Sequence, residues 1–541
     1  MGGGLMQLVA YGAQDVYLTG NPQITFWKVT YRRHTNFAME SIEQTFNGQA
    51  DFGRRVQCTI SRNGDLAYRT YLQVTLPEIN KNDGAVNDVC YARWLDCPGE
   101  QMISMVEVEI GGQRIDRQYG DWMHIWNQLT LTSEQEKGYN AMIGNTTQLT
   151  YLTDPAFADV ATACGAAGVP EAVCAPRNAL PETTLYVPLC FWFCRNPGLA
   201  LPLIALQYHE VKINIELRPM DECLFAVDKI AASTGETVKA TAAYSKSLVA
   251  ASLYVDYIFL DTDERRRMAQ NPHEYLIEQL QFTGDESIGS SSNKVKLNFN
   301  HPCKELIWVV QPDSNVSYCD SFVTGNTLNA ALGAQPFNYT DAVDALPNSI
   351  RAFSSRANLL NGDGGNLGNT GVISDGLFKD AGVNSTGAVD NPGLEPNEAA
   401  AFPTSVGGNN GVSDAGAFVL AETALTMHCW GENPVVTAKL QLNGQDRFSE
   451  REGTYFDLVQ PFQHHTRTPD TGINVYSFSL RPEEHQPSGT CNFSRIDNAT
   501  LQLVVSAAAI GSSATAKVRV YATNYNVLRV MSGMGGLAYS N

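Results

Sequence analysis

The chain has 541 residues, of which 43% are hydrophobic and 17% are charged, and its formal net charge is −19. A single hydrophobic core stops growing at roughly 250–300 residues, so this length predicts two large domains. The charged fraction lies below the roughly 25% of ordinary soluble domains, which favours a surface partly buried against other subunits. The acidic balance and the lack of a long Lys/Arg-rich stretch argue against direct binding to nucleic acid.

The sequence carries no recognisable membrane or secretion signal. Its first residues have neither the basic region nor the apolar region of a signal peptide. Met6 stands where an N-myristoylation motif requires Ser or Thr. No run of about 18 apolar residues occurs, so no membrane span is expected.

The twelve cysteines are scattered and include no CxxC pair. Cys190 and Cys194 lie four positions apart in an apolar run, a spacing more typical of buried thiols than of zinc ligands. We therefore expect reduced cysteines, in a cytosolic or nuclear compartment.

Short runs with apolar and polar residues in alternation dominate the chain, and turn residues separate them. The clearest predicted strands are residues 56–60, 71–76, 105–110, 211–217, 253–259, 306–310, 501–505 and 517–521. Helical pattern is sparse, and its best examples are residues 121–131 and the segment after Asp261. The sequence therefore predicts an all-β protein built from sandwiches, with few short helices.

The same elements recur in the same order in the two halves of the chain. Residues 108–115 (VEIGGQRI) are echoed by 440–448 (LQLNGQDRF), each a strand, a Gly-containing turn and a second strand. Residues 191–197 (FWFCRNP) are echoed by 476–482 (YSFSLRP), and each half closes with an aromatic-rich strand. This pattern indicates one sandwich that has been duplicated.

The duplication gives a predicted division of the chain. The segments are an N-terminal arm at 1–21, a first sandwich at 22–261, a linker at 262–272 and a second sandwich at 273–541. Residues 315–424 are rich in Gly, Asn, Ala and Ser, and we interpret them as a surface loop insertion in the second sandwich. The aromatic residues that could hold this insertion in an ordered tower are Phe337, Tyr339, Phe353, Phe378, Phe402 and Phe418.

Two aromatic groups could suggest a sugar-binding platform. Trp122 and Trp126 are four apart beside apolar neighbours, which is the spacing of one helix face. Residues 191–193 (FWF) form the second group. We interpret the tryptophan pair as core and the second group as sandwich core or a subunit contact.

Two groups of polar residues could suggest a metal site, and we expect none at either. His464 and His465 lie near an acidic stretch, but adjacent residues on a strand point to opposite faces. The residues of that stretch are Glu483, Glu484 and His485. The acidic residues Asp261, Asp263 and Glu264 lack the glycine and the final glutamate of a calcium loop, so we expect them to pair with the neighbouring arginines.

No GxSxG elbow, phosphate loop or HExxH motif is present, and no acidic pair stands out, so we predict no catalytic, cofactor-binding or metal-binding residues. Glycosylation sequons begin at Asn145, Asn315, Asn338, Asn384, Asn492 and Asn498. We expect the three in the loop insertion to be exposed, but without a signal peptide their occurrence by chance is the default interpretation.

Several blocks of the chain resemble the major capsid proteins of nucleocytoplasmic large DNA viruses. The blocks are 12–26 (GAQDVYLTGNPQITF), 31–37 (YRRHTNF), 109–115 (EIGGQRI), 119–122 (YGDW), 185–189 (LYVPL), 191–197 (FWFCRNP), 207–210 (QYHE), 261–270 (DTDERRRMAQ), 486–490 (QPSGT) and 492–497 (NFSRID). They occur in order across both halves. Residues 315–424 match nothing in this pattern.

The resemblance implies a double jelly roll, two tandem eight-stranded antiparallel sandwiches. It further implies a homotrimeric capsomer of pseudo-hexagonal outline that tiles an icosahedral shell, with neighbouring capsomers, minor capsid proteins and penton proteins as partners. Assembly in the host cytoplasm, an inner viral membrane nearby and possible glycans belong to the same expectation. The alternative hypothesis is a carbohydrate-binding or carbohydrate-cleaving tandem jelly roll, such as a viral attachment protein.

Overall fold

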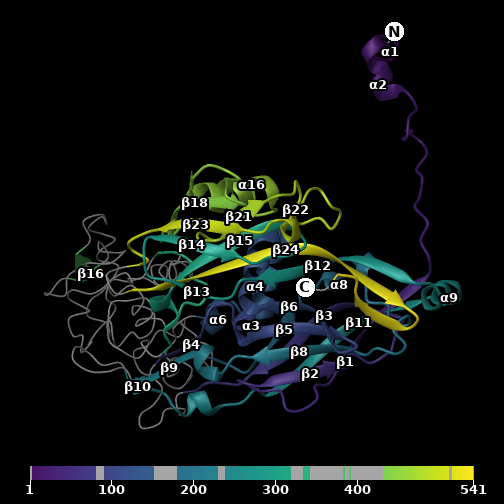
Figure 1. The fold of residues 1–541 in the computed structure, drawn as a ribbon. Helices are drawn as coiled ribbons and strands as arrows, with labels where there is room; N and C mark the ends of the chain where they lie inside the picture. The colour runs from purple at the N-terminus through teal and green to yellow at the C-terminus, as the bar shows by residue number, and fades with distance from the viewer. Residues whose placement is uncertain are drawn as a thin grey trace.

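Two β-sandwiches make up the body of the protein, with helix α4 (Gly120–Thr130) at their junction, and the N-terminal segment extends away from both (Figure 1). The computed structural model describes residues 3–80, 91–150, 180–229, 238–318, 333–341, 382–383, 389–390, 431–510 and 514–539. The predicted all-β class with few short helices is confirmed.

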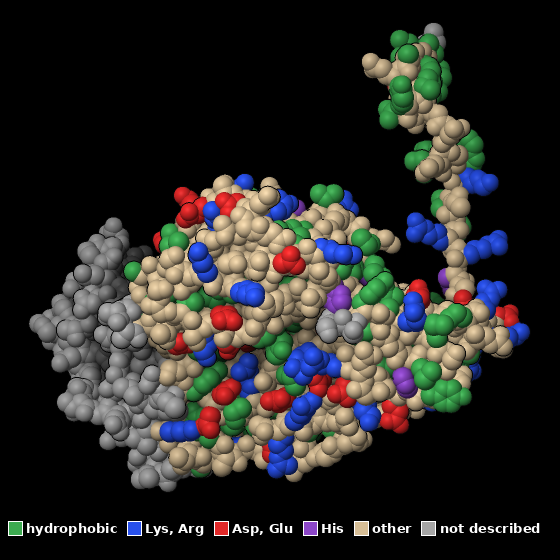
Figure 2. Space-filling model, in the orientation of Figure 1, with side chains coloured by type: hydrophobic (Ala, Val, Ile, Leu, Met, Phe, Trp, Pro, Cys, Tyr) green, Lys and Arg blue, Asp and Glu red, His purple; other side chains and the backbone are tan. Residues whose placement is uncertain are grey.

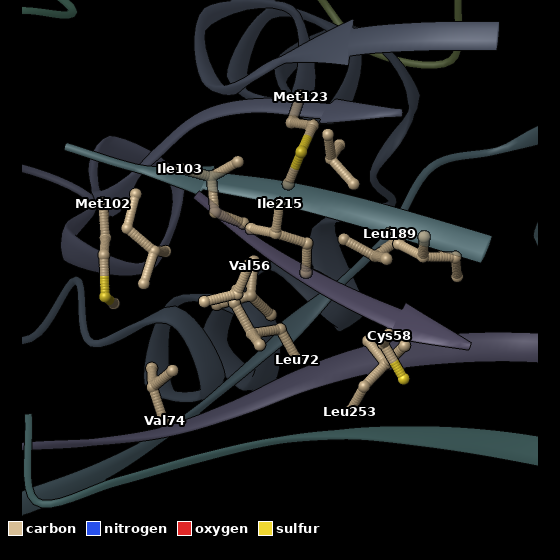
Figure 3. Packing of buried hydrophobic residues seen from close by; sticks show 14 of the residues in the cluster. Val56, Cys58, Leu72, Val74, Met102, Ile103, Met123, Leu189, Ile215 and Leu253 are labelled. Carbon is tan, nitrogen blue, oxygen red and sulfur yellow. The ribbon is translucent and has the colours of Figure 1, made fainter. Parts of the chain in front are cut away.

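The first sandwich consists of two antiparallel four-stranded sheets. In sheet order, the strands are β1 (Phe37–Gln44), β11 (Ala250–Leu260), β3 (Leu66–Leu76) and β7 (Thr183–Pro188) in one sheet, and β2 (Arg55–Thr59), β8 (Val211–Leu217), β5 (Ile103–Ile110) and β6 (Gln113–Tyr119) in the other. Alternate residues face inward, so Leu72 and Val74 of one sheet share a core with Val56 and Ile215 of the other (Figure 3). Each such buried side chain contributes about 1.5–3 kcal/mol.

The second sandwich repeats this arrangement. In sheet order, its strands are β12 (His273–Phe282), β24 (Ala516–Met531), β15 (Pro302–Pro312) and β21 (Asn474–Ser477) in one sheet, and β14 (Ser292–Leu297), β23 (Ala499–Val505), β18 (Val435–Leu442) and β19 (Gln445–Asp446) in the other. Shorter strands pair at the edges or elsewhere: β4 (Tyr91–Trp94), β9 (Leu224–Lys229), β10 (Val238–Lys239), β13 (Glu286–Ile288), β16 (Gly382–Val383), β17 (Val389–Asp390), β20 (Arg451–Glu452), β22 (Cys491–Asn492) and β25 (Met534–Leu537).

The duplication predicted from the sequence is visible in the order of the strands. Each element of β1-β11-β3-β7 has its counterpart in β12-β24-β15-β21, and β2-β8-β5-β6 corresponds to β14-β23-β18-β19. The two echoed hairpins are equivalent: β5 and β6 are joined at Gly111 and Gly112, and β18 and β19 at Asn443 and Gly444. All four turn residues have positive φ, between 50° and 83°, which is the geometry of a tight hairpin.

The second predicted echo is wrong in its register. Residues 191–197 follow strand β7 and contain the short helix α8 (Trp192–Arg195), whereas Tyr476 lies within strand β21. The equivalent of β21 is therefore β7 itself, a few residues earlier in the chain. The aromatic content of both stretches caused the error, since buried rings occur in strands and in short helices alike.

Both predicted helices are present, as α4 and as α9 (Thr262–Gln270), which connects β11 to β12. The other helical segments were not predicted: α1 (Gly3–Val9), η1 (Ala13–Asp15), α2 (Val16–Thr19), α3 (Pro98–Met102), α5 (Ser133–Ile143), α6 (Thr147–Thr150), α8, η4 (Pro197–Leu199), η5 (Met220–Glu222), η6 (Ala243–Ser245), η7 (Asp313–Asn315), η12 (Tyr455–Val459), α16 (Gln460–His464) and η13 (Phe493–Arg495). Most are a single turn, too short for a helical period to show in the sequence. Among the described residues, no helix is long and apolar enough to cross a membrane.

Most of the predicted insertion at 315–424 lies outside the described residues. Of the aromatic residues expected to hold it, Phe337 and Tyr339 are buried, at 6% and 1% exposure. Both pack in a cluster with helix α4. Phe353, Phe378, Phe402 and Phe418 lie outside the described residues.

Candidate assembly surfaces and the junction of the sandwiches

The N-terminal arm, which we define as residues 3–36, carries an unusual density of exposed apolar side chains. They are Leu5, Met6, Leu8, Val9, Tyr11, Val16, Tyr17, Leu18, Ile24, Phe26, Trp27, Val29 and Tyr31. Phe26 is 102% exposed and Tyr17 92%. The arm projects from the body, with apolar side chains gathered at its tip (Figure 2). Apolar surface on this scale marks a protein or membrane contact.

The charge of the arm is opposite to that of the whole chain. Lys28, Arg32 and Arg33 outweigh its one acidic residue, Asp15, whereas the chain as a whole has a net charge of −19. Basic side chains line the stalk between its tip and the body (Figure 2). Opposite charges attract across an interface, so this basic segment favours contact with acidic surfaces.

Helix α4 joins the two sandwiches through an apolar cluster. Trp122 and Trp126 are buried, at 0% and 6% exposure, and pack with Ile307 and Val309 of the second sandwich. The Trp122 ring lies 5.4 Å from the ring of Tyr521 on β24. The prediction that the tryptophan pair is core is thus confirmed. The cluster in which the pair packs contains residues of both sandwiches.

Strand β15 is buried on both faces at this junction. Its residues from Cys303 to Pro312 are all buried: Leu306 and Trp308 face the core of the second sandwich, and Ile307 and Val309 face α4. A strand covered on both faces tends to have a continuous apolar run, as residues 306–310 (LIWVV) do here. The two sandwiches therefore form one packed unit.

Ion pairs surround this apolar junction. Arg519 of β24 donates to Asp121 of α4 at 2.8 Å, and Arg195 of α8 donates to Glu278 of β12 at 3.0 Å. Glu278 also binds Lys304 at 2.9 Å. Although burial alone would raise the pKa of Glu278, hydrogen bonds from its neighbours and these cations lower it to about 2, so the carboxylate stays charged.

Asp116 of β6 also faces the second sandwich. Its Oδ1 accepts the backbone N–H of Leu280 at 3.1 Å. Burial raises the pKa of Asp116 to about 7. Together with the ion pairs, this contact fixes the register of β12 against the first sandwich.

The His464–His465 group does not converge on one site. His465 is buried between Glu305 at 2.8 Å and Glu483 at 2.9 Å, whereas His464 is half-buried and contacts the carbonyl of Leu480. The two adjacent histidines point in different directions, but they lie at the end of helix α16 and not, as predicted, on a strand. The remaining members, Glu484 and His485, bind Arg481 and Glu278 respectively. Sequence reasoning missed Glu305, since it lies far away in the chain.

The charged residues after β11 act in three ways. Asp261 caps α9 by accepting the N–H of Thr262 at 2.8 Å, and Asp263 binds Arg266 at 3.1 Å. The predicted pairing with neighbouring arginines is thus correct for Asp263. Arg265 instead binds Asp65 of the first sandwich at 3.0 Å.

The described cysteines are free thiols. Cys190 and Cys194 are partly buried, and burial raises their pKa values to about 12 and about 11. They act as small apolar groups at these positions, which agrees with the prediction of buried thiols.

The aromatic run at Phe191, Trp192 and Phe193 is core, with exposures of 0–2%. Trp94 and Trp308 are buried as well, so Trp27 of the arm is the exposed tryptophan in the part of the chain that is described. The two aromatic groups singled out in the sequence therefore offer no exposed ring for a sugar-binding platform.

The expected exposure of the sequons in the insertion is wrong for two of them. Asn315 and Asn338 are buried, at 0% and 2% exposure, and Asn384 lies outside the described residues. Asn145 is half-buried, while Asn492 and Asn498 are exposed.

Two tandem jelly rolls of the same strand order, sharing a buried junction, define a double jelly-roll capsid protein. The solved capsid of the virus PBCV-1 has the same fold, with a TM-score of 0.59 at 32% identity, over 96% of this chain and 100% of that one. Residues 25–261 match the family described as major capsid protein N-terminus, and residues 264–536 match the large eukaryotic DNA virus major capsid protein. The chain belongs to this family.

Relatives in the family are similar over their full length. The major capsid protein of Phaeocystis pouchetii virus is 74% identical over 543 residues and that of Chrysochromulina ericina virus 69% over 591, each covering 100% of both chains. That of Paramecium bursaria Chlorella virus 1 is 38% identical over 564 residues, again over 100% of both chains. This chain is therefore a structural component of a virion and not an enzyme.

Proposed function

We propose that the chain assembles into homotrimeric capsomers of pseudo-hexagonal outline, which tile the icosahedral shell of a large DNA virus. The observation that carries this proposal is the identical strand order of the two sandwiches. A threefold ring of such subunits presents six similar sandwiches, and six similar edges permit lattice packing. Closed symmetric assembly of identical chains is the usual form of a soluble oligomer.

This proposal assigns a role to each segment of the chain. We take the first jelly roll to begin at strand β1, Phe37, and to end at residue 261, with 262–272 as the linker and 273–541 as the second jelly roll. The expected tower at 315–424 concerns residues that lie mostly outside the described ones. The arm, 1–21 together with the exposed residues up to 36, lies on the inner side and contacts a neighbouring capsomer, a minor capsid protein or a penton protein. Its exposed apolar side chains support this role.

The same proposal places assembly in the cytoplasm of the host cell, without direct contact with the genome. The net charge of −19 opposes binding to phosphate. An inner viral membrane would lie on the side of the arm. Of the sequons, those at the exposed Asn492 and Asn498 are the candidates for glycans.

Size-exclusion chromatography with light scattering on the purified full chain tests the oligomer. The expected mass is three times that of one chain, and images of the particle should show a six-cornered outline. A monomer across protein concentration, salt and pH would contradict the proposal, because obligate interfaces bury on the order of 2,000–5,000 Å² and do not dissociate readily.

A further inference from the structure

A cavity of about 240 Å³ lies beside helix α4, at the junction of the two sandwiches. Cys97, Glu100 and His124 line it, and one potential ligand atom from each lies within 4.8 Å of the other two. All three residues are buried, at 6%, 1% and 4% exposure. A thiol, a carboxylate and an imidazole thus meet at buried positions on the wall of this cavity.

The hydrogen bonds around Glu100 hold its carboxylate in one orientation. Oε2 faces Nδ1 of His124 at 2.8 Å, while Oε1 accepts from Asn127 at 3.1 Å and from the hydroxyl of Tyr139 at 2.5 Å. Asn127 and Tyr139 are thus outer groups of the kind that orient a ligating carboxylate at metal sites.

His124 leaves one nitrogen unused. Its Nε2 is buried and has no hydrogen-bond partner among the described residues. A buried polar atom without a partner destabilises the folded state, so its retention calls for an explanation. The ring is fixed in place by stacking on Phe337 at 4.1 Å between ring centroids.

We propose that Cys97, Glu100 and His124 bind one zinc-class divalent cation through Sγ, a carboxylate oxygen and a ring nitrogen, with water completing its coordination. Thiolate, imidazole and carboxylate are the zinc donors, and a thiolate disfavours magnesium and calcium. On binding, the S–H bond of Cys97 breaks, its proton passes to solvent, and sulfur bonds to the ion. This site differs from the sequence-based expectation that the chain has no metal-binding residues.

The surroundings of the cavity favour entry of a cation. Asp96 and Asp470 also line it, while the one arginine of the lining, Arg467, is bound to Glu136 at 2.6 Å. Phe337 and Asp470 belong to the second half of the chain, and the three ligands to the first. A bound ion would therefore strengthen the junction between the sandwiches, whether or not the chain forms trimers.

Cobalt(II) is the probe for this site, because a cysteine thiolate bound to it gives a charge-transfer absorption in the near ultraviolet. The full chain, stripped with a chelator, should develop this band up to one equivalent of Co²⁺ and lose it when Zn²⁺ is added. The Cys97→Ala variant should show no band. Cys58→Ala, which alters an equally buried thiol of the first sandwich core, should retain it.

Absence of the band from the unaltered chain would overturn the proposal, as would a band that persists in Cys97→Ala. Should Cys97→Ala fail to fold, His124→Gln replaces it. In that variant one equivalent of Zn²⁺ should no longer raise the thermal midpoint, whereas it raises the midpoint of the unaltered chain. An equal rise in both would likewise refute the site.

Discussion

Arg519 of strand β24 donates through Nη1 to Oδ2 of Asp121 on helix α4, 2.8 Å away, and so connects the second sandwich to the first. Nε of the same arginine donates to Asp285, also at 2.8 Å. The side chains of Arg519 and Asp121 are only 13% and 12% exposed. Despite burial, the surrounding carboxylates raise the pKa of Arg519 and keep it charged.

Replacement of Arg519 by methionine should lower the free energy of unfolding by about 3–5 kcal/mol, because it leaves a nearly buried carboxylate without its main partner. Urea denaturation of the purified chain measures this loss. The matched control is Arg529→Met on the same strand, whose pair with Glu274 is 51% and 59% exposed. There the change should be below about 1 kcal/mol. Equal effects would show that Arg519 has no special role at the junction.

The stability of the protein should fall as pH rises through 9, because of His465. Glu305 and Glu483 outweigh the effect of burial and raise its pKa from 6.5 to about 9. A raised histidine pKa stabilises the fold fully below the unfolded value, near 6.5, and this contribution is lost as pH passes the folded value. The loss should be on the order of 2–4 kcal/mol.

Urea denaturation at pH 6 and pH 9.5 measures this effect as the difference between the unaltered chain and His465→Gln. The difference should shrink at the higher pH. His464→Gln, at the half-buried neighbouring position, should keep the pH dependence of the unaltered chain. A difference that is independent of pH would mean that His465 is neutral in the folded protein.

Truncation of Trp122 to alanine should destabilise the junction by about 3–5 kcal/mol, since the side chain is fully buried and leaves a cavity. Trp27→Ala removes the same atoms from the arm, where the ring is 85% exposed. That variant should unfold like the unaltered chain. Thermal unfolding distinguishes the two, and comparable midpoints would contradict the assignment of Trp122 to the shared core.

Deletion of residues 1–36 should leave the fold and the trimer intact and weaken assembly beyond the trimer. Strand β1 begins at Phe37, so no strand is lost. Light scattering measures the trimer, and sedimentation with minor capsid proteins measures higher assembly. Unchanged sedimentation would exclude the arm as a contact in higher assembly. Loss of the trimer would show that the arm is needed to form the capsomer itself.

The sequence alone was sufficient to predict the all-β class, both main helices and the duplication. Alternation along β23 (ATLQLVV) and the turn at Asn443 and Gly444 are local properties, and neighbouring residues determine them. Hairpin turns and strand periodicity can therefore be predicted from the sequence with few errors.

The tertiary structure decided which faces are covered. Along β24, Val518 and Val520 face the core of the second sandwich. Arg519 and Tyr521 alternate with them, so from the sequence alone they would be expected to face solvent. Helix α4 covers that face, so both residues lie at the junction of two sandwiches. Burial by an element nearly 400 positions away leaves no local signal. For the same reason, the sequence did not indicate that Cys97, Glu100 and His124 lie close together. Their spacing along the chain does not determine the distances between their side chains.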